Sequence, residues 1–277
     1  RIGASPVLAA SVADANSPAA RAADRVIVIG PAQAAQSYLR PEQVAQAAVN
    51  AGAAVVHPGY GFLSEQPRLC ELLEEEGIAF AGPRPETLRA VGDKGSARQV
   101  AIDANVPVAA GVEITDVSYV RALGEQIGYP LLIKAIHGGG GRGIRLVTNP
   151  DELADLAPQA AAEAEAAFGN GALYLERYYG RARHVEVQVF GDGNGRAWIF
   201  GDRDCSVQRR HQKIIEESPS PAVSAALREQ LGQAAIALAQ SAGYVGAGTV
   251  EFLLDEAQSD KPFYLMEMNT RLQVEHP

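Results

Sequence analysis

The spacing of apolar residues predicts a mixed helix and strand protein from its first residues onward. Over the first ~90 positions, short apolar runs alternate with segments whose apolar residues recur every three to four positions. This alternation of strand and helix predicts a parallel α/β sheet. The expected strands are 6–10, 25–29, 53–57 and 78–81, and the expected helices are 41–52, 64–77, with Ser64 as its cap, and 93–105.

In the middle of the chain the pattern changes to pairs of strands joined by polar or glycine-rich segments. Two apolar runs, 130–135 and 144–147, flank a loop at 137–143. Asn149 then precedes Pro150 and Glu152, which is the arrangement of a capped helix start. Further strands are expected at 173–179, 184–190, 197–200, 249–254 and 263–269, with one helix ending near 169 and another at 224–242.

Polar and apolar residues alternate along the last segment of the chain. The odd positions carry polar or charged side chains, namely Glu267, Asn269, Arg271, Gln273 and Glu275. Because successive residues of a strand point to opposite faces, an extended segment would present all five on one face. Each of these groups can ligate a metal, bind an oxyanion or move a proton. We therefore expect a functional strand here, with the protein continuing beyond this chain.

Composition excludes several classes of protein. The 277 residues are 47% hydrophobic and 21% charged, as in ordinary globular domains, and can form one large or two to three small domains. A formal charge of -9 argues against nucleic-acid binding, and no apolar run approaches the ~20 residues needed to span a membrane. Cys70 and Cys205 fit neither a zinc pattern nor a disulfide framework, which favours the cytoplasm. A mitochondrial or plastid location stays open, since the chain begins with Arg1.

The loop at 137–143 contains four consecutive glycines, 138–141. Glycines let backbone N–H groups approach a phosphate without a Cβ in the way. The loop joins two strands, so it differs from the strand-to-helix turn of Walker and Rossmann sites. With Lys134 at the end of the preceding strand, it is typical of a hairpin lid over phosphates. A flexible connection without a ligand is the alternative interpretation.

A second candidate site combines Glu251 with Glu267 and Asn269. Glu251 lies among apolar residues on a strand that must bury one face, and a hairpin would bring it to the other two. Oxygen ligands of this kind suit Mg²⁺, which usually takes one or two carboxylates together with phosphate oxygens and water. Solvated charges at a sheet edge are the alternative.

A third candidate is the block 203–213. It holds five basic or potentially basic side chains within an acidic protein. Such a block favours an anion pocket for phosphate, bicarbonate or a carboxylate. A surface turn balanced by Glu216 and Glu217 is the alternative.

With these segments taken together, the sequence resembles biotin carboxylase, a member of the ATP-grasp superfamily. The resemblance covers nearly the whole chain from about Val7, and the matching segments are 57–65, 92–94, 133–134, 138–143, 203–213, 246–249 and 267–277. It implies an α/β protein, α+β in its ATP-grasp part. The implied parts are an N-terminal parallel-sheet domain at 1–92 and an ATP-grasp domain at 93–277, with a lid at about 110–180 that closes over ATP and is mobile when empty. The C-terminal biotin carboxylase domain would lie outside this chain.

The resemblance also implies roles for single residues. The implied ATP contacts are Lys94, Lys134, Gly140, Gly141, Glu176, Arg177, Tyr178, Tyr179, His184, Gln208, His211, Glu251 and Glu267. The implied ligands of Mg²⁺ or Mn²⁺ are Glu251, Glu267 and Asn269, and the implied bicarbonate site is Lys213, Arg271, Gln273, Val274 and Glu275. The catalytic residues would be Lys213, Arg271 and Glu275, with Glu275 as the general base and Arg271 stabilising carboxyphosphate and the charge that develops on biotin. His137 stands where some relatives have glycine.

The activity implied is MgATP- and bicarbonate-dependent carboxylation of carrier-bound biotin, with an acyl-CoA carboxylase favoured as the complete system. A biotin carboxyl carrier, a carboxyltransferase component and a homodimer are the implied partners, without nucleic acid or membrane. Two alternatives are another ATP-grasp ligase, such as a carbamoyl-phosphate synthetase or an amino-acid ligase, and an inactive nucleotide-binding fragment. The blocks 203–213 and 271–275 argue against the first, and the intact metal, base and anion positions argue against the second.

Overall fold

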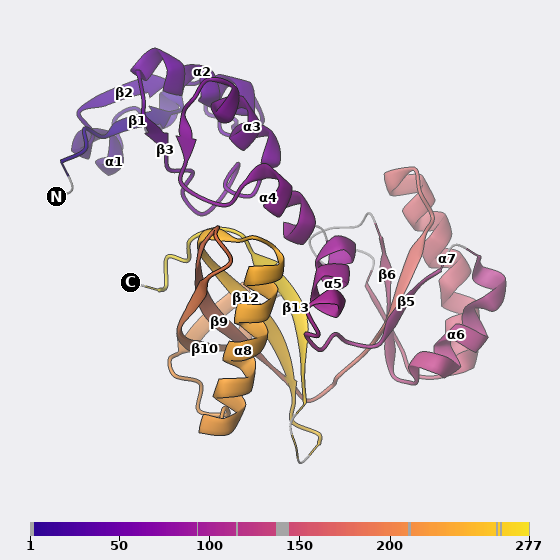
Figure 1. Ribbon diagram of the computed structural model, residues 1–277. Coiled ribbons are helices and arrows are strands. Elements are labelled where there is room, and N and C mark those ends of the chain that lie inside the picture. The colour runs from indigo at the N-terminus through magenta and orange to yellow at the C-terminus, as the bar shows by residue number, and fades with distance from the viewer. Residues whose placement is uncertain are drawn as a thin grey trace.

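A computed structural model describes residues 3–276 apart from 93, 115, 137–143, 210–211, 259 and 261, and it leaves the side chains of residues 94, 167 and 168 undescribed. The described chain forms three parts, and the helix α5 of the third part precedes the second part in sequence (Figure 1). The first part is indigo to purple, the second runs from magenta to pink and stands to one side, and the third is an orange and yellow sheet with a long helix across it.

The first part contains two pairs of parallel strands with helices around them. Its strands pair as β1 with β2 and β3 with β4. Gly52 ends α2 in a left-handed conformation (φ 64°), which glycine adopts without strain. The bounds are β1 Val7–Ala10, η1 Val12–Asp14, α1 Pro18–Ala22, β2 Arg25–Val28, η2 Ala34–Gln36, α2 Pro41–Ala51, β3 Val55–Val56, α3 Pro67–Glu75, β4 Ala79–Phe80 and α4 Pro85–Gly92.

Three details of this part differ from the sequence prediction, and one of them is the short helix α1, which was not expected. Ser64 does not cap α3, because the helix begins at Pro67 with Gln66 at the cap position. Proline suits the first helical turn, where its missing N–H is not needed, and Ser64 is buried in the preceding loop. The short helix α4 was not expected, and it forms because Leu88 and Val91 can be buried together on one side.

The second part is a four-stranded antiparallel sheet with two helices, α6 and α7, against it. The strand order is β5-β8-β6-β7. Asn149 caps α7 as expected, since its Oδ1 accepts hydrogen bonds from the backbone N–H groups of Asp151 (3.1 Å) and Glu152 (3.0 Å). The bounds are β5 Gly111–Ile114, η3 Val117–Tyr119, α6 Val120–Ile127, β6 Leu131–Ala135, β7 Arg145–Val147, α7 Pro150–Phe168 and β8 Leu173–Arg177.

The third part is a five-stranded antiparallel sheet in the order β11-β10-β9-β12-β13. Val185, Val187 and Val189 alternate along β9 and join the same buried core as Leu231 of α8. The residues between these valines therefore point to the opposite face of the sheet. The bounds are α5 Lys94–Asp103, β9 Ala182–Asp192, β10 Ala197–Arg209, β11 Gln212–Glu217, α8 Ala225–Ser241, β12 Val245–Asp255 and β13 Phe263–Asn269.

The strand predicted at 263–269 is confirmed by β13, but the alternating segment does not continue as a strand to Glu275, and that part of the prediction is wrong. β13 ends at Asn269, opposite Thr249 of β12. The next backbone N–H, that of Thr270, donates to Glu65 Oε1 at 2.9 Å, and a turn follows in which His276 N donates to Gln273 O at 3.2 Å. The chain leaves the sheet because its backbone hydrogen bonds go to other partners.

Strand lengths in the third part also differ from expectation. β10 continues to Arg209, well beyond the predicted 197–200, and β11 was not predicted. Both segments are rich in charged side chains, which hides the apolar alternation of an ordinary strand. Among the described residues, none of the helices combines the length and the apolar character that crossing a bilayer requires.

Candidate active site

Charged side chains form a row across four strands of the five-stranded sheet. Glu267 of β13 is opposite Glu251 of β12, which is opposite Glu186 of β9, which in turn is opposite Arg203 of β10. Directly opposed residues in antiparallel strands project from the same face and interact. The row lies on the face away from α8, so the fold itself gathers three carboxylates and a guanidinium at one place.

Glu251 stands at the centre of this row and receives three donors. His184 Nε2 lies 2.5 Å from its Oε2, while Lys213 Nζ at 2.8 Å and Asn269 Nδ2 at 2.6 Å reach its Oε1. Burial by itself would raise the pKa of Glu251. The hydrogen bond and charge of His184 and the charge of Lys213 outweigh burial and lower the pKa to about 2. The carboxylate is therefore ionised at neutral pH.

Glu186 is fully buried, and its two oxygens are both taken by cations. Arg203 Nε binds one oxygen and Lys213 Nζ binds the other. Lys213 thus lies between two carboxylates, Glu186 and Glu251. Burial opposes the charge on Lys213, but these two carboxylates outweigh it and raise the pKa of the ammonium group. The site therefore contains a permanently charged lysine held in place from both sides.

Arg271 and Gln273 belong to the same network although they lie outside the strand. Gln273 is buried, and its Nε2 donates to Thr249 Oγ1 at 3.0 Å. Its Oε1 accepts a hydrogen bond from Arg271 Nη1 at 3.1 Å. Val274 and Glu275 follow with exposed side chains. The structure therefore brings Arg271 and Gln273 of the expected bicarbonate site to the sheet through a side-chain tether.

The expected nucleotide contacts are divided between two sheets. In the four-stranded sheet, Lys134 Nζ lies 2.6 Å from Glu176 Oε1. In the five-stranded sheet, Gln208 Nε2 lies 2.7 Å from His184 Nδ1.

The segment between these two sheets carries the remaining described contacts. Arg177 donates to the carbonyl of Tyr129, and the N–H of Tyr178 donates to the carbonyl of Pro130 at 3.0 Å. The ring of Tyr179 stacks on Tyr264 with 4.6 Å between centroids. The Lys94 side chain and residues His137, Gly140, Gly141 and His211 lie outside what the structure describes.

A cavity of about 630 Å³ lies where the first part meets β13. Its lining includes Glu65 from the first part together with Glu267 and Asn269 of β13. Residues at this end of β13 and residues of the first part therefore line one shared space.

The proposed metal ligands fit a hard cation. Glu251 and Glu267 are directly opposed on neighbouring strands, and Asn269 contacts Glu251. Two carboxylates and an amide offer oxygen ligands, which Mg²⁺ and Mn²⁺ prefer, and leave room for phosphate oxygens. These three residues are therefore the set that could hold the metal expected from the sequence.

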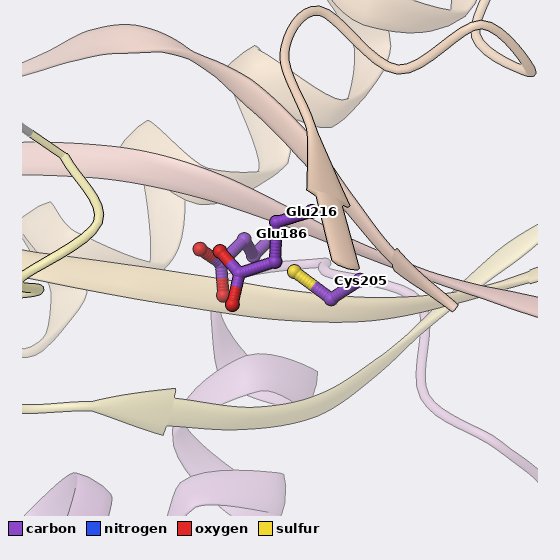
Figure 2. Close-up of side chains that lie close together, drawn as sticks. All are labelled: Glu186, Cys205 and Glu216. Carbon is purple, nitrogen blue, oxygen red and sulfur yellow. The ribbon is translucent and has the colours of Figure 1, made fainter. Parts of the chain in front are cut away.

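A second group of potential ligand atoms is less suited to a metal. Glu186, Cys205 and Glu216 place one ligand atom each within 4.8 Å of one another. Figure 2 shows these three side chains close together. Arg203 and Lys213 neutralise Glu186, and burial raises the pKa of the Cys205 thiol, which keeps it protonated and makes it a poor metal ligand. The group is thus a neutralised part of the network rather than a metal centre.

Sequence reasoning missed Glu65, Glu186 and Glu216. A signal for Glu186 was present, because it lies between two valines on a strand and matches the surroundings that singled out Glu251. For Glu65 the signal is its place in the matching segment 57–65, which does not indicate partners about 205 positions away in the chain.

Comparison with known protein families identifies the class of protein to which the chain belongs. Residues 93–277 match the family described as "Carbamoyl-phosphate synthase L chain, ATP binding domain", and residues 1–88 match "Biotin carboxylase, N-terminal domain". The chain therefore carries an ATP-binding domain of the ATP-grasp type behind a biotin carboxylase N-terminal domain. It belongs to the biotin carboxylase family, and the fold class and the resemblance predicted from the sequence are confirmed.

The relatives agree with this assignment. A chloroplastic biotin carboxylase 2 of Populus trichocarpa is 51% identical over 257 residues, covering 92% of this chain and 48% of its own length. A biotin carboxylase of Campylobacter jejuni in complex with β-γ-ATP superimposes with a TM-score of 0.88 at 44% identity, covering 98% of this chain and 60% of that chain.

A second solved structure holds further ligands. It is the biotin carboxylase domain dimer of a Hydrogenobacter thermophilus 2-oxoglutarate carboxylase with MgADP, ADP and bicarbonate. Its TM-score is 0.86 at 40% identity, with 98% of this chain and 59% of that chain covered. The chain spans about half the length of curated relatives that it matches, 48% in the case of the Populus protein.

Proposed function

We propose that this chain carries the site at which a biotin carboxylase uses MgATP and bicarbonate to carboxylate carrier-bound biotin. The observation that carries the proposal is the placement of Lys213. It is held between Glu186 and Glu251 on the same face as the Arg271–Gln273 tether, which supports an anion pocket beside the proposed metal ligands. The relatives solved with an ATP analogue, or with MgADP and bicarbonate, support the same pair of substrates.

ATP would be bound by residues of both sheets. Lys134 would neutralise phosphate charge, and it exchanges its present partner Glu176 for phosphate oxygens. His184 and Gln208 would contact the nucleotide from the five-stranded sheet. We also assign to ATP binding Lys94, Gly140, Gly141, Glu176, Arg177, Tyr178, Tyr179, His211, Glu251 and Glu267.

Glu251, Glu267 and Asn269 would hold Mg²⁺, which when bound neutralises charge on the ATP phosphates. His184 and Lys213 lower the pKa of Glu251, and its carboxylate is therefore ionised at neutral pH. His184 Nε2 and Lys213 Nζ also hold the carboxylate at one place on the sheet, so little rearrangement is needed when a cation arrives.

For the reaction, a bicarbonate oxygen attacks the γ-phosphorus of ATP, and ADP leaves. Glu275 accepts the remaining proton of bicarbonate as the new bond forms, giving carboxyphosphate. Lys213 and Arg271 offset the negative charge, while Gln273 and Val274 line the same pocket. Carboxyphosphate separates into CO₂ and phosphate, the phosphate takes the N1 proton of biotin, and N1 then bonds to CO₂. Positioning and charge neutralisation are what the protein supplies.

The surrounding system is part of the proposal. A biotin carboxyl carrier would deliver biotin, and a carboxyltransferase component would use carboxybiotin, in a homodimeric complete enzyme of the cytoplasm. An acyl-CoA is the favoured final acceptor. The dimeric Hydrogenobacter domain supports the homodimer, and the chloroplastic name of the Populus relative makes a plastid the competing location.

ATP cleavage by the protein, measured with and without bicarbonate and free biotin, tests the proposal. We expect cleavage that requires bicarbonate and increases with biotin. Cleavage that responds instead to ammonia or to an amino acid would identify a different ATP-grasp ligase. MgATP binding without turnover would identify the inactive nucleotide-binding alternative.

A further inference from the structure

Glu65 joins the first part of the protein to the anion pocket. Its Oε1 accepts hydrogen bonds from the backbone N–H of Thr270 at 2.9 Å and from the Thr270 hydroxyl at 3.2 Å. Its other oxygen, Oε2, lies 3.6 Å from Arg271 Nε. The Glu65 carboxylate therefore holds the backbone at Thr270, where the chain leaves β13, and also pairs with Arg271. About 205 positions separate Glu65 from Thr270.

The segment that carries Glu65 is itself well anchored. Leu63 and Ser64, just before it, are buried in the first part. Phe62 adopts a positive φ of 51° and stacks on Tyr38 with 5.0 Å between ring centroids. A positive φ is uncommon for a residue with a Cβ. Although Phe62 is 60% exposed, its stacking on Tyr38 and the burial of Leu63 and Ser64 restrain the segment just before Glu65. The position of Glu65 is therefore set by the core of the first part.

The guanidinium of Arg271 is held from two sides. Nε faces Glu65, and Nη1 donates to Gln273 Oε1 at 3.1 Å and to the carbonyl of Leu272 at 3.3 Å. Because the guanidinium is planar and rigid, two fixed edges determine where its remaining N–H groups point. The described contacts engage Nε and Nη1, and Nη2 can therefore serve an oxyanion.

We propose that Glu65 is a positioning residue for bicarbonate: it orients Arg271 toward the anion and makes the anion pocket depend on the docked first part. The inference rests on the proposed function, because it assigns bicarbonate to the Arg271 pocket. Glu65 acts through Arg271, and Thr270 fixes the distance between them. The first part of the chain thereby contributes to anion binding through a residue from its loop.

The variant Glu65→Gln separates the two roles of the carboxylate. The amide oxygen still accepts the Thr270 hydrogen bonds, while the charge that pairs with Arg271 is removed. Glu75→Gln is the matched control. Glu75 is also in the first part and lies 3.8 Å from an arginine, Arg68, and this ion pair does not involve β13. Glu65→Gln is also combined with Arg271→Ala in a double-mutant cycle.

Bicarbonate binding is measured as the thermal stabilisation that bicarbonate produces in the presence of MgADP, which requires no turnover. KM for bicarbonate and for MgATP is measured in the ATP cleavage assay. For a partly exposed arginine–carboxylate pair, we expect Glu65→Gln to weaken bicarbonate binding and to raise its KM by about three- to tenfold. The KM for MgATP and the Tm without ligand should match those of the Glu75→Gln control.

In the Arg271→Ala background, Glu65→Gln should change bicarbonate binding by less than about twofold, because the residue it acts through is gone. Wild-type bicarbonate affinity in Glu65→Gln overturns the inference. Equal losses of Tm, MgATP affinity and bicarbonate affinity also overturn it, since they indicate a purely structural role.

The wild-type protein distinguishes this inference from the proposed function. If bicarbonate stabilises it but ATP is not cleaved, the proposed activity fails, and the binding comparison still decides the role of Glu65. If bicarbonate gives no stabilisation, Arg271 forms no anion pocket and the inference is wrong.

Discussion

The five-stranded and four-stranded sheets hold their charged residues in different ways. On the five-stranded sheet, Glu186 and Glu251 are buried and share Lys213, so the charges form a connected network. On the four-stranded sheet, Lys134 and Glu176 form a separate pair whose side chains are 24% and 23% exposed. Under the proposed function, the first arrangement fixes groups before a substrate arrives, whereas in the second Lys134 would exchange its partner for phosphate.

The difference assigns separate tasks to the two sheets. Preorganised charges are most effective where charge develops during a reaction, because they need not move at that moment. A simple ion pair is better suited to binding and release. Changes on the five-stranded face should therefore affect turnover most, and changes on the four-stranded sheet should affect mainly nucleotide affinity.

The largest effect is expected for Glu275→Gln. The substitution keeps the shape of the side chain and removes the proton acceptor, so bicarbonate-dependent ATP cleavage should fall by ~100- to 10,000-fold. MgATP affinity, measured by calorimetry, should stay unchanged because Glu275 is not a metal ligand in this assignment. Normal turnover, or a loss explained by failure to bind MgATP, would show that another residue is the base.

Glu267→Gln should have the next largest effect. It removes one charged ligand of the expected Mg²⁺ while preserving size, and ATP cleavage should decrease by at least ~100-fold. Glu229→Gln on α8 is the control. The carboxylate of Glu229 accepts a hydrogen bond from Gln233, and this contact does not involve the charged network. Cleavage near the wild-type rate in Glu267→Gln would contradict the metal assignment.

Lys134→Met tests the four-stranded sheet. A charged hydrogen bond to phosphate would be lost, so MgATP affinity should weaken by about 10- to 100-fold. Arg121→Gln, in the same sheet unit and paired with Asp151 at 2.8 Å, should leave the affinity unchanged. If Lys134→Met lowers turnover but leaves MgATP affinity intact, the division of tasks between the two sheets is wrong.

The smallest effect concerns stability and the pKa of Glu216. Burial and then the charges of Glu275 and Glu186 raise this pKa above the 4.5 of an ordinary glutamate. The folded state therefore disfavours the ionised form of Glu216. In the unfolded chain its pKa is about 4.5, so the protein loses stability as the pH rises above this value.

Glu216→Gln should accordingly raise the Tm at pH 8 by about 1–3 °C, with a gain that shrinks as the pH approaches 4.5. Calorimetry at several pH values measures this, with the exposed neighbour Glu217→Gln as control. A gain that is independent of pH would mean that the charge of Glu216 is not its cause.

Short-range chemistry in the sequence determined much of the fold. Asn149 caps α7, and Gly52 and Gly169 end their helices in left-handed conformations, because these features depend on a few neighbouring residues. The opposition of Glu251 and Glu267 was also predictable, because a hairpin pairs neighbouring strands of opposite direction.

Other features of the site were decided by tertiary structure. The buried ion pairs of Glu186 depend on β9 lying beside β10 in one particular register, with Lys213 reaching in from β11. β13 ends at Asn269 because a carboxylate from a distant loop, that of Glu65, takes the next backbone N–H. Periodicity along a chain indicates which side of a helix or strand is polar. It does not indicate which distant groups pair with its charges and hydrogen-bonding groups, because those groups come close only when the parts of the protein pack together.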